Sequence, residues 1–469
     1  MVGNGTSPSH FFFSNINLTG VFTHTQIRKD GFTFERGPRG FRPSGNGLTT
    51  LRLIEDLGLE SEALGTSSAS TNRYLWCNNQ MIQLPSSPTN MLRDPKLSFM
   101  LFSALVRDIC TAKSDKKDET VYEFASRRFG PNVASILVDS MISGIYAGNS
   151  RKLSIRSCFP LLYKLEGEYG SVVKGMIRRR KETTPMCKSS ELAAFETETE
   201  VTKILARSMQ VSFRSGMATL SHSLESSLRK DEENVTLMLN SRASGLRPPG
   251  DNSGDNSGGM VVSVEGDDAS DVLVDEVVTT LPASTMSKLM GENEKVRDAF
   301  QDLAVNTKGV DVAVVNMGYQ KNLVKLPYNG FGFLVPSREY SELLGVTWDS
   351  LVFPAQQDDG VCAMTAMIGG AHHPHVGAMS NSELREMAQR LVLPKLNIRE
   401  KPSTIYCGVA KNCIPQYNVG HHESVLRVEN TLREAFRGRV HAIGTSLYGV
   451  GVADLVYQAL RTADTLTLN

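Results

Sequence analysis

A glycine-rich segment near the end of the 469-residue chain has the residue types of a ligand-binding turn. Residues Gly438 to Asp454 indicate a short apolar strand followed by a turn that contains Gly444, Gly449 and Gly451. An amphipathic helix from Val452 to Leu466 is predicted to follow it. Glycines let another molecule approach the backbone, and a helix N-terminus presents free N–H groups. Such a turn can hold a phosphate or an electron-rich ring, although a glycine-rich turn alone is weak evidence.

A second segment with possible binding chemistry lies near the other end. Residues Phe32 to Gly45 alternate apolar and polar side chains and then enter a turn rich in Gly and Pro. Arg39 and Arg42 stand among these glycines, where they could hold anionic groups; a solvated loop is the simpler alternative. Residues Leu48 to Leu57 are predicted to form an amphipathic helix that ends at Gly58.

Together, these two ends resemble the protoporphyrinogen oxidases, which are flavoenzymes of haem synthesis. Other motifs of the family follow in its order, from about Gly20 to the C-terminus. They are Ile145–Pro160, Val277–Ala283, Gly330–Pro336 and Lys411–Tyr417.

The resemblance implies oxidation of protoporphyrinogen IX to protoporphyrin IX in three two-electron steps. FAD would accept the hydrogen, and dioxygen would reoxidise the flavin to give hydrogen peroxide. Because the isoalloxazine ring accepts the hydride, the protein would bind and orient the substrate and exclude water. No catalytic side chain and no metal are therefore expected.

The resemblance also implies a substrate site. Arg73 should hold a propionate, because a guanidinium can pair with both carboxylate oxygens. Phe331 and Leu334 should clamp the flat tetrapyrrole, Met367 should pack near the flavin, and Gly144 should leave room for the ring. Without the resemblance, Arg73 would be taken as a surface arginine and the apolar residues as core positions.

Several positions match the family's FAD site. The matched cofactor-binding residues are Gly20, Phe22, Gly37, Pro38, Arg39, Gly40, Ala243, Ile414, Val450, Gly451 and Val452. Gly20 and Phe22 depart from the family pattern, which has a double glycine and a tryptophan there.

The first strand–turn–helix unit of such flavoproteins has no counterpart in the sequence. That unit carries a G-x-G-x-x-G turn, which cradles the pyrophosphate of FAD. In Gly3-Asn-Gly5, a proline occupies the place of the last glycine and no apolar strand precedes it. Residues up to about Asn17 look unrelated to the family. A lost first exon and a shortened isoform would both explain this.

Composition excludes several classes. Lys plus Arg equals Asp plus Glu, which gives no sign of a nucleic-acid partner. The seven scattered cysteines favour a reducing compartment. His372-His-Pro-His375 is interpreted as a loop in preference to a metal site. No cleavable signal peptide is predicted, because the Phe11–Phe13 run is too short.

No stretch is apolar for the roughly 18 residues that a membrane span needs. Residues Lys96 to Cys110 are rich in Phe, Leu and Met, and Lys113, Lys116 and Lys117 follow them. A helix of this kind can lie in the interface of a bilayer, or it can be buried in a helical subdomain. Similarity to a family of peripheral inner-membrane enzymes favours the interface.

We expect a mixed α/β (α+β) flavoprotein of the FAD/NAD(P)-binding type. Its FAD-binding domain should comprise residues 1–75, 205–285 and 405–469. A helical membrane-facing domain should span 76–204 and a sheet-based substrate domain 286–404. The segment 181–202 should be an exposed connection, and the repeat at 251–258 a hairpin insertion.

Two hypotheses remain on the sequence alone. The first is an active oxidase that acts with FAD and dioxygen. It would be a homodimer attached peripherally to the mitochondrial inner membrane, or located in a plastid in a photosynthetic organism. The second is a flavin-deficient relative that retains only porphyrin binding or dimerisation. Other amine-oxidase-like enzymes, such as desaturases, would not account for the motif at Ile145–Pro160.

Overall fold

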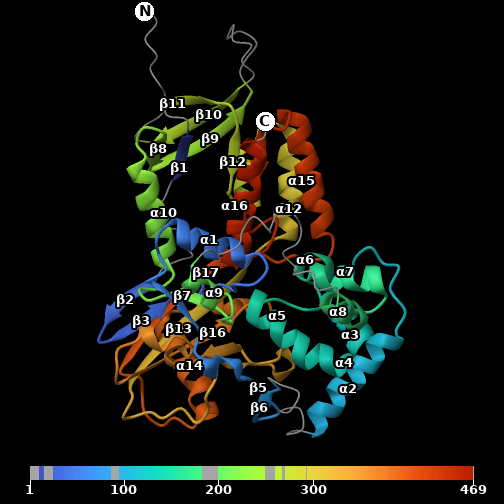
Figure 1. The fold of residues 1–469 in the computed structure, drawn as a ribbon, viewed down its shortest axis with the longest axis vertical. Coiled ribbons are helices and arrows are strands. Elements are labelled where there is room, and N and C mark those ends of the chain that lie inside the picture. Colours follow the sequence, from blue (N-terminus) through green and yellow to red (C-terminus); the bar gives the residue numbers. More distant parts are fainter. Residues whose placement is uncertain are drawn as a thin grey trace, which may run out of the picture.

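A computed structural model gives the fold shown in Figure 1. It describes residues 10–14, 25–85, 95–181, 199–248, 259–266, 270–291 and 293–467. The lower half of the view holds a large sheet beside a group of helices, and the upper half holds smaller sheets flanked by long helices. The molecule therefore has the mixed α/β architecture expected from the sequence.

A seven-stranded sheet forms the largest core. Its spatial order is β17-β13-β16-β15-β14-β5-β6, and every neighbouring pair is antiparallel except β14 with β5. The strands are β5 (Arg73–Cys77), β6 (Gln80–Leu84), β13 (Val310–Gln320), β14 (Gly332–Leu334), β15 (Leu343–Thr347), β16 (Val361–Gly369) and β17 (Thr404–Ile414). Nearly all of β16 is buried, because α14 (Asn381–Val392) covers one face and β3 (Phe32–Glu35) packs on the other.

The upper half contains short parallel strand pairs and one antiparallel sheet. Its strands are β1 (His10–Ser14), β8 (Val235–Leu239), β9 (Ser241–Arg247), β10 (Met260–Gly266), β11 (Ser270–Val274), β12 (Val277–Thr279) and β18 (Val440–Ala442). Its helices are α10 (Ala218–Lys230), α11 (Ala283–Leu289), α12 (Glu294–Asn306) and α15 (His421–Phe436). The last three helices pack against β12 and β18 around Phe300 and Leu432.

Several further strands and helices complete the fold. They are β2 (Thr25–Lys29), β4 (Ala63–Gly65), β7 (Val211–Phe213), α1 (Gly47–Asp56), α9 (Glu200–Leu205), α13 (Asp349–Val352) and α16 (Val452–Thr467). Helices α1 and α16 pack together, so the two ends of the chain meet.

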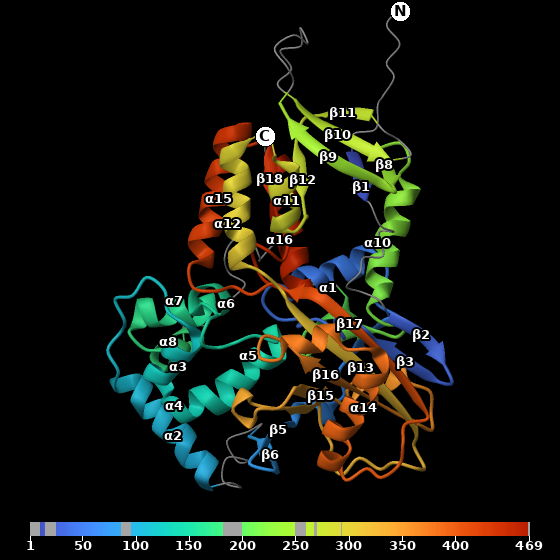
Figure 2. The same ribbon diagram turned by 180° about the vertical axis from the view of Figure 1, so that it is seen from behind.

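The helical group forms one side of the lower half, seen from behind in Figure 2. It contains α2 (Pro95–Cys110), α3 (Val121–Phe129), α4 (Pro131–Val133), a π-helical turn (Ala134–Val138), α5 (Asp139–Tyr146), α6 (Ile155–Cys158), α7 (Pro160–Tyr169) and α8 (Val172–Lys181). Among the described helices, none is both long enough and apolar enough to cross a membrane.

Several elements differ from those expected. The Val-rich stretch Asp271–Pro282 forms two strands, β11 and β12, which are separated by charged residues. The stretch Ser157–Arg178 belongs to three helices, because Pro160 starts a new one and Gly170 adopts a left-handed conformation. Strands β5 and β6, and all of β17 except Thr404, lie outside the range 286–404, yet they belong to the large sheet. Most of the segment 181–202 and all of the repeat at 251–258 fall outside the described residues.

Candidate active site

A chain of buried polar contacts fixes Arg39 in the turn after β3. Its Nε donates to Asp349 Oδ1 at 2.9 Å, and the two side chains are only 9% and 11% exposed. The other oxygen of Asp349 accepts from Thr365 Oγ1 at 2.5 Å, and Thr365 accepts from Asn316 Nδ2 at 2.8 Å. One nitrogen of Arg39, Nη2, is buried and has no hydrogen-bond partner. Because buried guanidinium nitrogens normally have an acceptor, Arg39 is suited to bind one supplied by a ligand.

Glycine allows the chain to pass close to its neighbours around Arg39. A Cβ atom at Gly40 would lie 2.6 Å from the carbonyl oxygen of Val211, where the bridge between Phe41 and Val211 holds the turn. Gly37 and Pro38 lie in the same turn and are partly exposed. A side chain at Gly40 would therefore push the turn out of place.

The C-terminal glycine turn meets this N-terminal turn. Asp454, in the first turn of α16, accepts from Asn46 Nδ2 at 3.0 Å and from the backbone N–H of Gly451 at 3.3 Å. The carboxylate thus occupies the N-terminus of α16. Because a second negative charge would be repelled there, the turn does not suit a phosphate and is better suited to a neutral ring. Of the two ligand types expected from the sequence, a phosphate and an electron-rich ring, only the ring suits this turn.

A stacked Tyr417–His421 pair holds the rest of that turn. The two rings lie 4.2 Å apart between centroids. Tyr417 OH donates to the carbonyl of Thr445, and the two nitrogens of His421 contact Ser157 Oγ and the carbonyl of Ser446. Burial lowers the pKa of His421 to about 4, so the ring is neutral at physiological pH. Its N–H therefore donates to Ser446, and its other nitrogen accepts from Ser157.

The residues expected to line the substrate site lie at the junction of the large sheet and the helical group. Leu334 in β14 contacts α5 where Gly144 stands: a Cβ there would lie 2.9 Å from one Leu334 methyl group and 3.1 Å from the other. Met367 in β16 and Ile414 in β17 pack in one apolar cluster with Ala147, which follows α5. Ile414 also packs in the cluster that contains Val450. Apolar contacts therefore connect Met367 to the C-terminal turn.

Arg73 and Phe331 lie together at the parallel junction of β5 and β14. The guanidinium carbon of Arg73 is 6.0 Å from the centroid of the Phe331 ring. Partial burial and the positive charge of Arg42 lower the pKa of Arg73. Among the described ion pairs, neither arginine has a carboxylate partner. A guanidinium group beside an aromatic ring, with a second positive charge near enough to lower its pKa, suits a flat ligand with carboxylate arms.

Of the remaining expected cofactor residues, Ala243 lies apart from this site and two are not described. Ala243 is in β9, where it packs with Met238 and Val264 in the upper half of the molecule. Gly20 and Phe22 lie outside the described residues. Val452, in contrast, begins α16 and packs against the cluster around Leu51.

Comparison with known proteins identifies the family. The sequence profile of the flavin-containing amine oxidoreductases matches residues 23–467. Protoporphyrinogen oxidase of Bos taurus is 35% identical over 446 residues, which cover 92% of this chain and 88% of the relative. The chain belongs to the protoporphyrinogen oxidase family. Protoporphyrinogen oxidase of Schizosaccharomyces pombe is 29% identical, with coverage of 92% and 86%.

Solved structures support the fold. A protein assigned as a protoporphyrinogen oxidase in an Exiguobacterium species superposes with a TM-score of 0.72 at 19% identity, over 95% of this chain and 90% of that one. UDP-galactopyranose mutase superposes with a TM-score of 0.65 at 14% identity, over 96% and 88%. At these identities, the likeness concerns the fold alone.

The cofactor of the family is FAD, and the described residues fit one end of it. The unpartnered Nη2 of Arg39 and the glycine-lined turn at Gly449–Gly451 suit the flavin ring. The pyrophosphate end does not fit. Asp454 occupies the N-terminus of α16, and no strand–glycine turn–helix unit of the G-x-G-x-x-G type occurs in the described part of the chain.

Sequence patterns did not reveal the residues that position this site. Asp349, Thr365 and Asn316 are isolated polar residues in apolar surroundings, and their partners lie far away in the sequence. A polar residue inside a buried strand, such as Thr365 in β16, was the only feature of the sequence that could have indicated this network. The segment His372–His375 leads into a short 3₁₀ turn, and the described residues contain no cluster that could hold a metal ion.

Proposed function

We propose that this chain oxidises protoporphyrinogen IX to protoporphyrin IX, with FAD as the hydrogen acceptor and dioxygen as the final oxidant. Its 35% identity to protoporphyrinogen oxidases of cattle and humans supports the substrate class. The observation that carries the proposal is the position of Arg73 beside Phe331, with Arg42 as a second cation and no acidic partner for either among the described ion pairs. A tetrapyrrole with two propionates matches both the ring and the charges.

Each group of residues has a distinct part in this proposal. Arg73 binds a propionate and fixes the orientation of the macrocycle, while Phe331 and Leu334 contact its faces. Gly144 lets Leu334 pack closely against α5, because any side chain there would meet Leu334. When bound, the flavin accepts a hydride from the substrate in each two-electron step. Arg39, held by Asp349, would donate a hydrogen bond to the bound ring, and Met367 with Ile414 would exclude water from one side of it.

Substrate choice tests the proposal. A coproporphyrinogen III oxidase of Bacillus subtilis is 26% identical to this chain, so coproporphyrinogen III is the relevant competitor. With excess FAD, we expect porphyrin fluorescence to rise faster with protoporphyrinogen IX than with coproporphyrinogen III. The opposite order would assign the chain to the more carboxylated substrate. No rise above spontaneous oxidation with either substrate, in protein shown to contain flavin, would contradict the proposal.

We also propose that α2 attaches the protein to a membrane surface. The large apolar side chains on one face of α2 are exposed: Phe99 73%, Phe102 63%, Leu105 44%, Val106 46% and Ile109 42%. On neighbouring α8, Met176 and Ile177 are 53% and 50% exposed. A helix buried in a subdomain would not leave these side chains in water, so the exposure favours the interfacial alternative.

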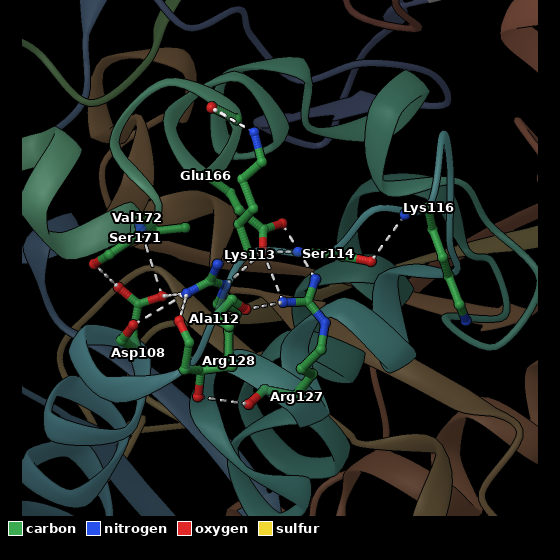
Figure 3. Close-up of polar contacts among 12 residues, drawn as sticks. Asp108, Ala112, Lys113, Ser114, Lys116, Arg127, Arg128, Glu166, Ser171 and Val172 are labelled. Carbon is green, nitrogen blue, oxygen red and sulfur yellow. Dashed lines mark hydrogen bonds and ion pairs between the residues drawn. The ribbon is translucent and has the colours of Figure 1, made fainter.

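The opposite face of α2 explains why its apolar side chains point outward. Figure 3 shows that Asp108 of α2 faces Arg128 of α3 and the start of α8. Asp108 accepts from Ser171 Oγ and from the backbone N–H of Val173, and Arg128 also pairs with Glu166 of α7. Because Asp108 and Arg128 are fully buried, this charged network fixes the rotation of α2 about its axis.

A triple substitution tests the membrane proposal. Replacement of Phe99, Leu101 and Phe102 by serine should move the protein from the membrane pellet to the supernatant, with its thermal transition retained. The matched control replaces Val305, Leu323 and Tyr340, which are exposed apolar residues outside α2. This control should stay in the pellet. Loss of the folded state in the α2 variant, or equal release of both variants, would show that the interfacial assignment is wrong.

Location and assembly extend the proposal. Relatives include a mitochondrial enzyme of tobacco and a chloroplastic/mitochondrial one of Arabidopsis thaliana. We propose the mitochondrial inner membrane, or a plastid membrane in a photosynthetic organism, and a homodimer, which light scattering would test. The expected division into FAD-binding, helical and substrate domains also remains a proposal.

One observation favours the flavin-deficient alternative: the described residues offer no binding site for the pyrophosphate of FAD. It predicts that the chain binds a porphyrin but remains inactive even when FAD is in excess.

A further inference from the structure

The loop that carries Phe331 is held at both of its backbone groups. The N–H of Phe331 donates to the carbonyl oxygen of Asn72 at 2.9 Å, and its C=O accepts from the N–H of Trp348 at 3.0 Å. Asn72 directly precedes Arg73, whose guanidinium carbon lies 6.0 Å from the centroid of the Phe331 ring. A backbone hydrogen bond of Asn72 therefore brings together the arginine and the aromatic ring proposed to contact the substrate.

The strand pairing beside this loop contributes little to its position. Strands β14 and β5 pair over only two residue pairs, the first of which is Phe333 opposite Tyr74, and Phe331 lies before them. Glycines flank Phe331 on both sides, and Gly332 has a φ of +146°, which favours glycine. Because glycine has the widest choice of backbone conformations, the loop has little rigidity of its own. Other contacts must fix it.

The side chain of Asn72 supplies such contacts. Its Nδ2 donates to the carbonyl oxygen of Asn329 at 3.1 Å, and its Oδ1 accepts from Gln83 Nε2 at 3.0 Å. Tyr74 OH donates to the same carbonyl of Asn329 at 3.2 Å. A Cβ atom at Gly330 would lie 2.6 Å from the carbonyl oxygen of Asn72. The loop therefore approaches Asn72 as closely as a glycine permits.

Asn72 is itself well anchored. Its N–H donates to the carbonyl of Ala69 at the end of the 3₁₀ turn Ser68–Thr71. Just before this turn, Ser67 donates both its N–H and its Oγ to carbonyl oxygens of α13. Helix α13 begins with Asp349, the counter-ion of the arginine on the flavin side. Asn72 thus connects the glycine-flanked loop to a fixed part of the molecule.

We propose that Asn72 is a positioning residue of the substrate slot, because it holds Phe331 and Arg73 in one arrangement before the substrate binds. The slot comprises the residues proposed to contact the substrate, which are Arg73, Phe331, Leu334 and Gly144. This inference rests on the proposed function. Without the side chain of Asn72, the loop would become ordered only on binding, and such ordering reduces affinity.

Binding of protoporphyrin IX, measured by quenching of protein fluorescence, tests the proposal without flavin. Asn72→Ala should raise the dissociation constant about three- to tenfold, because a hydrogen bond that orders the loop is lost. Tyr74→Phe removes the other side-chain donor to Asn329 and keeps the packed ring, so it should raise the constant about two- to threefold. The matched control Asn306→Ala removes a side-chain hydrogen bond to Ser424 in the upper half and should leave the constant unchanged.

A double variant distinguishes positioning from a general effect on stability. In a Phe331→Ala background, Asn72→Ala should change the dissociation constant by less than about twofold, because the ring that Asn72 orients is absent. The proposal is overturned by unchanged binding in Asn72→Ala, by an equal loss in Asn306→Ala, or by the same loss with and without the Phe331 ring. If Asn72→Ala does not fold, Tyr74→Phe decides, and unchanged binding in that variant overturns the proposal.

Kinetics of the flavin-loaded protein provide a second readout. Asn72→Ala should raise the KM for protoporphyrinogen IX and leave kcat within about twofold, because the loss concerns binding and not the hydride acceptor. A lower kcat with an unchanged KM would contradict the proposal.

The outcomes also separate this inference from the proposed function. If the protein oxidises protoporphyrinogen IX but Asn72→Ala binds protoporphyrin IX as tightly as the unmodified chain, only the inference fails. If Asn72→Ala weakens porphyrin binding as expected, yet the flavin-containing protein oxidises no porphyrinogen, only the proposed function fails.

Discussion

Replacement of Asp349 by alanine should destabilise the protein more than any neighbouring polar substitution. Asp349 is the counter-ion of Arg39, and both side chains are about nine-tenths buried. The same carboxylate accepts from Thr365. The substitution would leave a buried guanidinium without an opposite charge and would remove the acceptor of a buried hydroxyl group.

The expected magnitudes follow from these contacts. Removal of one partner of a buried ion pair costs about 3–5 kcal/mol. Asp349→Asn keeps an acceptor for Arg39 Nε and loses only the charge, which should cost about 1–2 kcal/mol. Thr365→Val removes hydrogen bonds to Asp349 and Asn316 but leaves the ion pair intact, so we expect about 1–3 kcal/mol.

Urea unfolding of the flavin-free variants would measure these effects, because the denaturation midpoint shifts in proportion to stability when the slope is unchanged. A double variant, Arg39→Leu with Asp349→Ala, removes both charges. It should be more stable than Asp349→Ala alone, because no uncompensated charge remains. The explanation would be refuted if Asp349→Ala changed stability by less than about 1 kcal/mol, or if the second substitution gave no recovery.

Three further predictions concern the slot and the glycine turn. Arg73→Ala should raise the KM for protoporphyrinogen IX at least about tenfold, because a charge-assisted pair contributes roughly 1.5–3 kcal/mol, whereas Arg385→Ala on α14 should leave KM unchanged; an unchanged KM would remove Arg73 from the site. Gly144→Val should narrow the slot by driving Leu334 from its position, so porphyrin binding should weaken more than in Gly167→Val, where a Cβ meets nothing within 4 Å; equal effects would contradict this assignment. His421 has a pKa lowered from 6.5 to about 4, so the unfolded chain binds its proton first. Its contribution to stability should be complete above about pH 6.5 and should diminish as the pH falls towards 4, and His421→Gln should flatten this part of a stability–pH curve.

The sequence predicted local features well where the hydrophobic periodicity was regular and where glycine or proline marked the ends of elements. The amphipathic pattern at Leu48–Leu57 became α1, and the glycine turn at Gly449 led into α16 as expected. The segment that follows Arg39 and the C-terminal turn, far apart in the sequence, do meet through Asn46 and Asp454. The family motifs, and not the local patterns, made that expectation possible.

Other features were beyond the reach of local patterns. The Arg39–Asp349 pair spans 310 positions in the sequence, and no periodicity encodes such a contact. Strand β1 lies in a stretch that looked unrelated to the family, because its strand character comes from parallel pairing with β8. The stretch Ser157–Arg178 divides into three helices at Pro160 and Gly170. At these two residues the backbone conformation of proline and of glycine ends one helix and starts the next, even though the amphipathic pattern continues.

The central claim is that flavin held by this chain takes hydrogen from protoporphyrinogen IX. Anaerobic mixing of the flavin-loaded protein with protoporphyrinogen IX tests it most directly. The account predicts that the oxidised flavin absorbance is bleached in a single turnover, and that admission of dioxygen restores it with formation of hydrogen peroxide. A flavin-loaded protein that binds the porphyrinogen, yet keeps its oxidised spectrum under these conditions, would contradict the account.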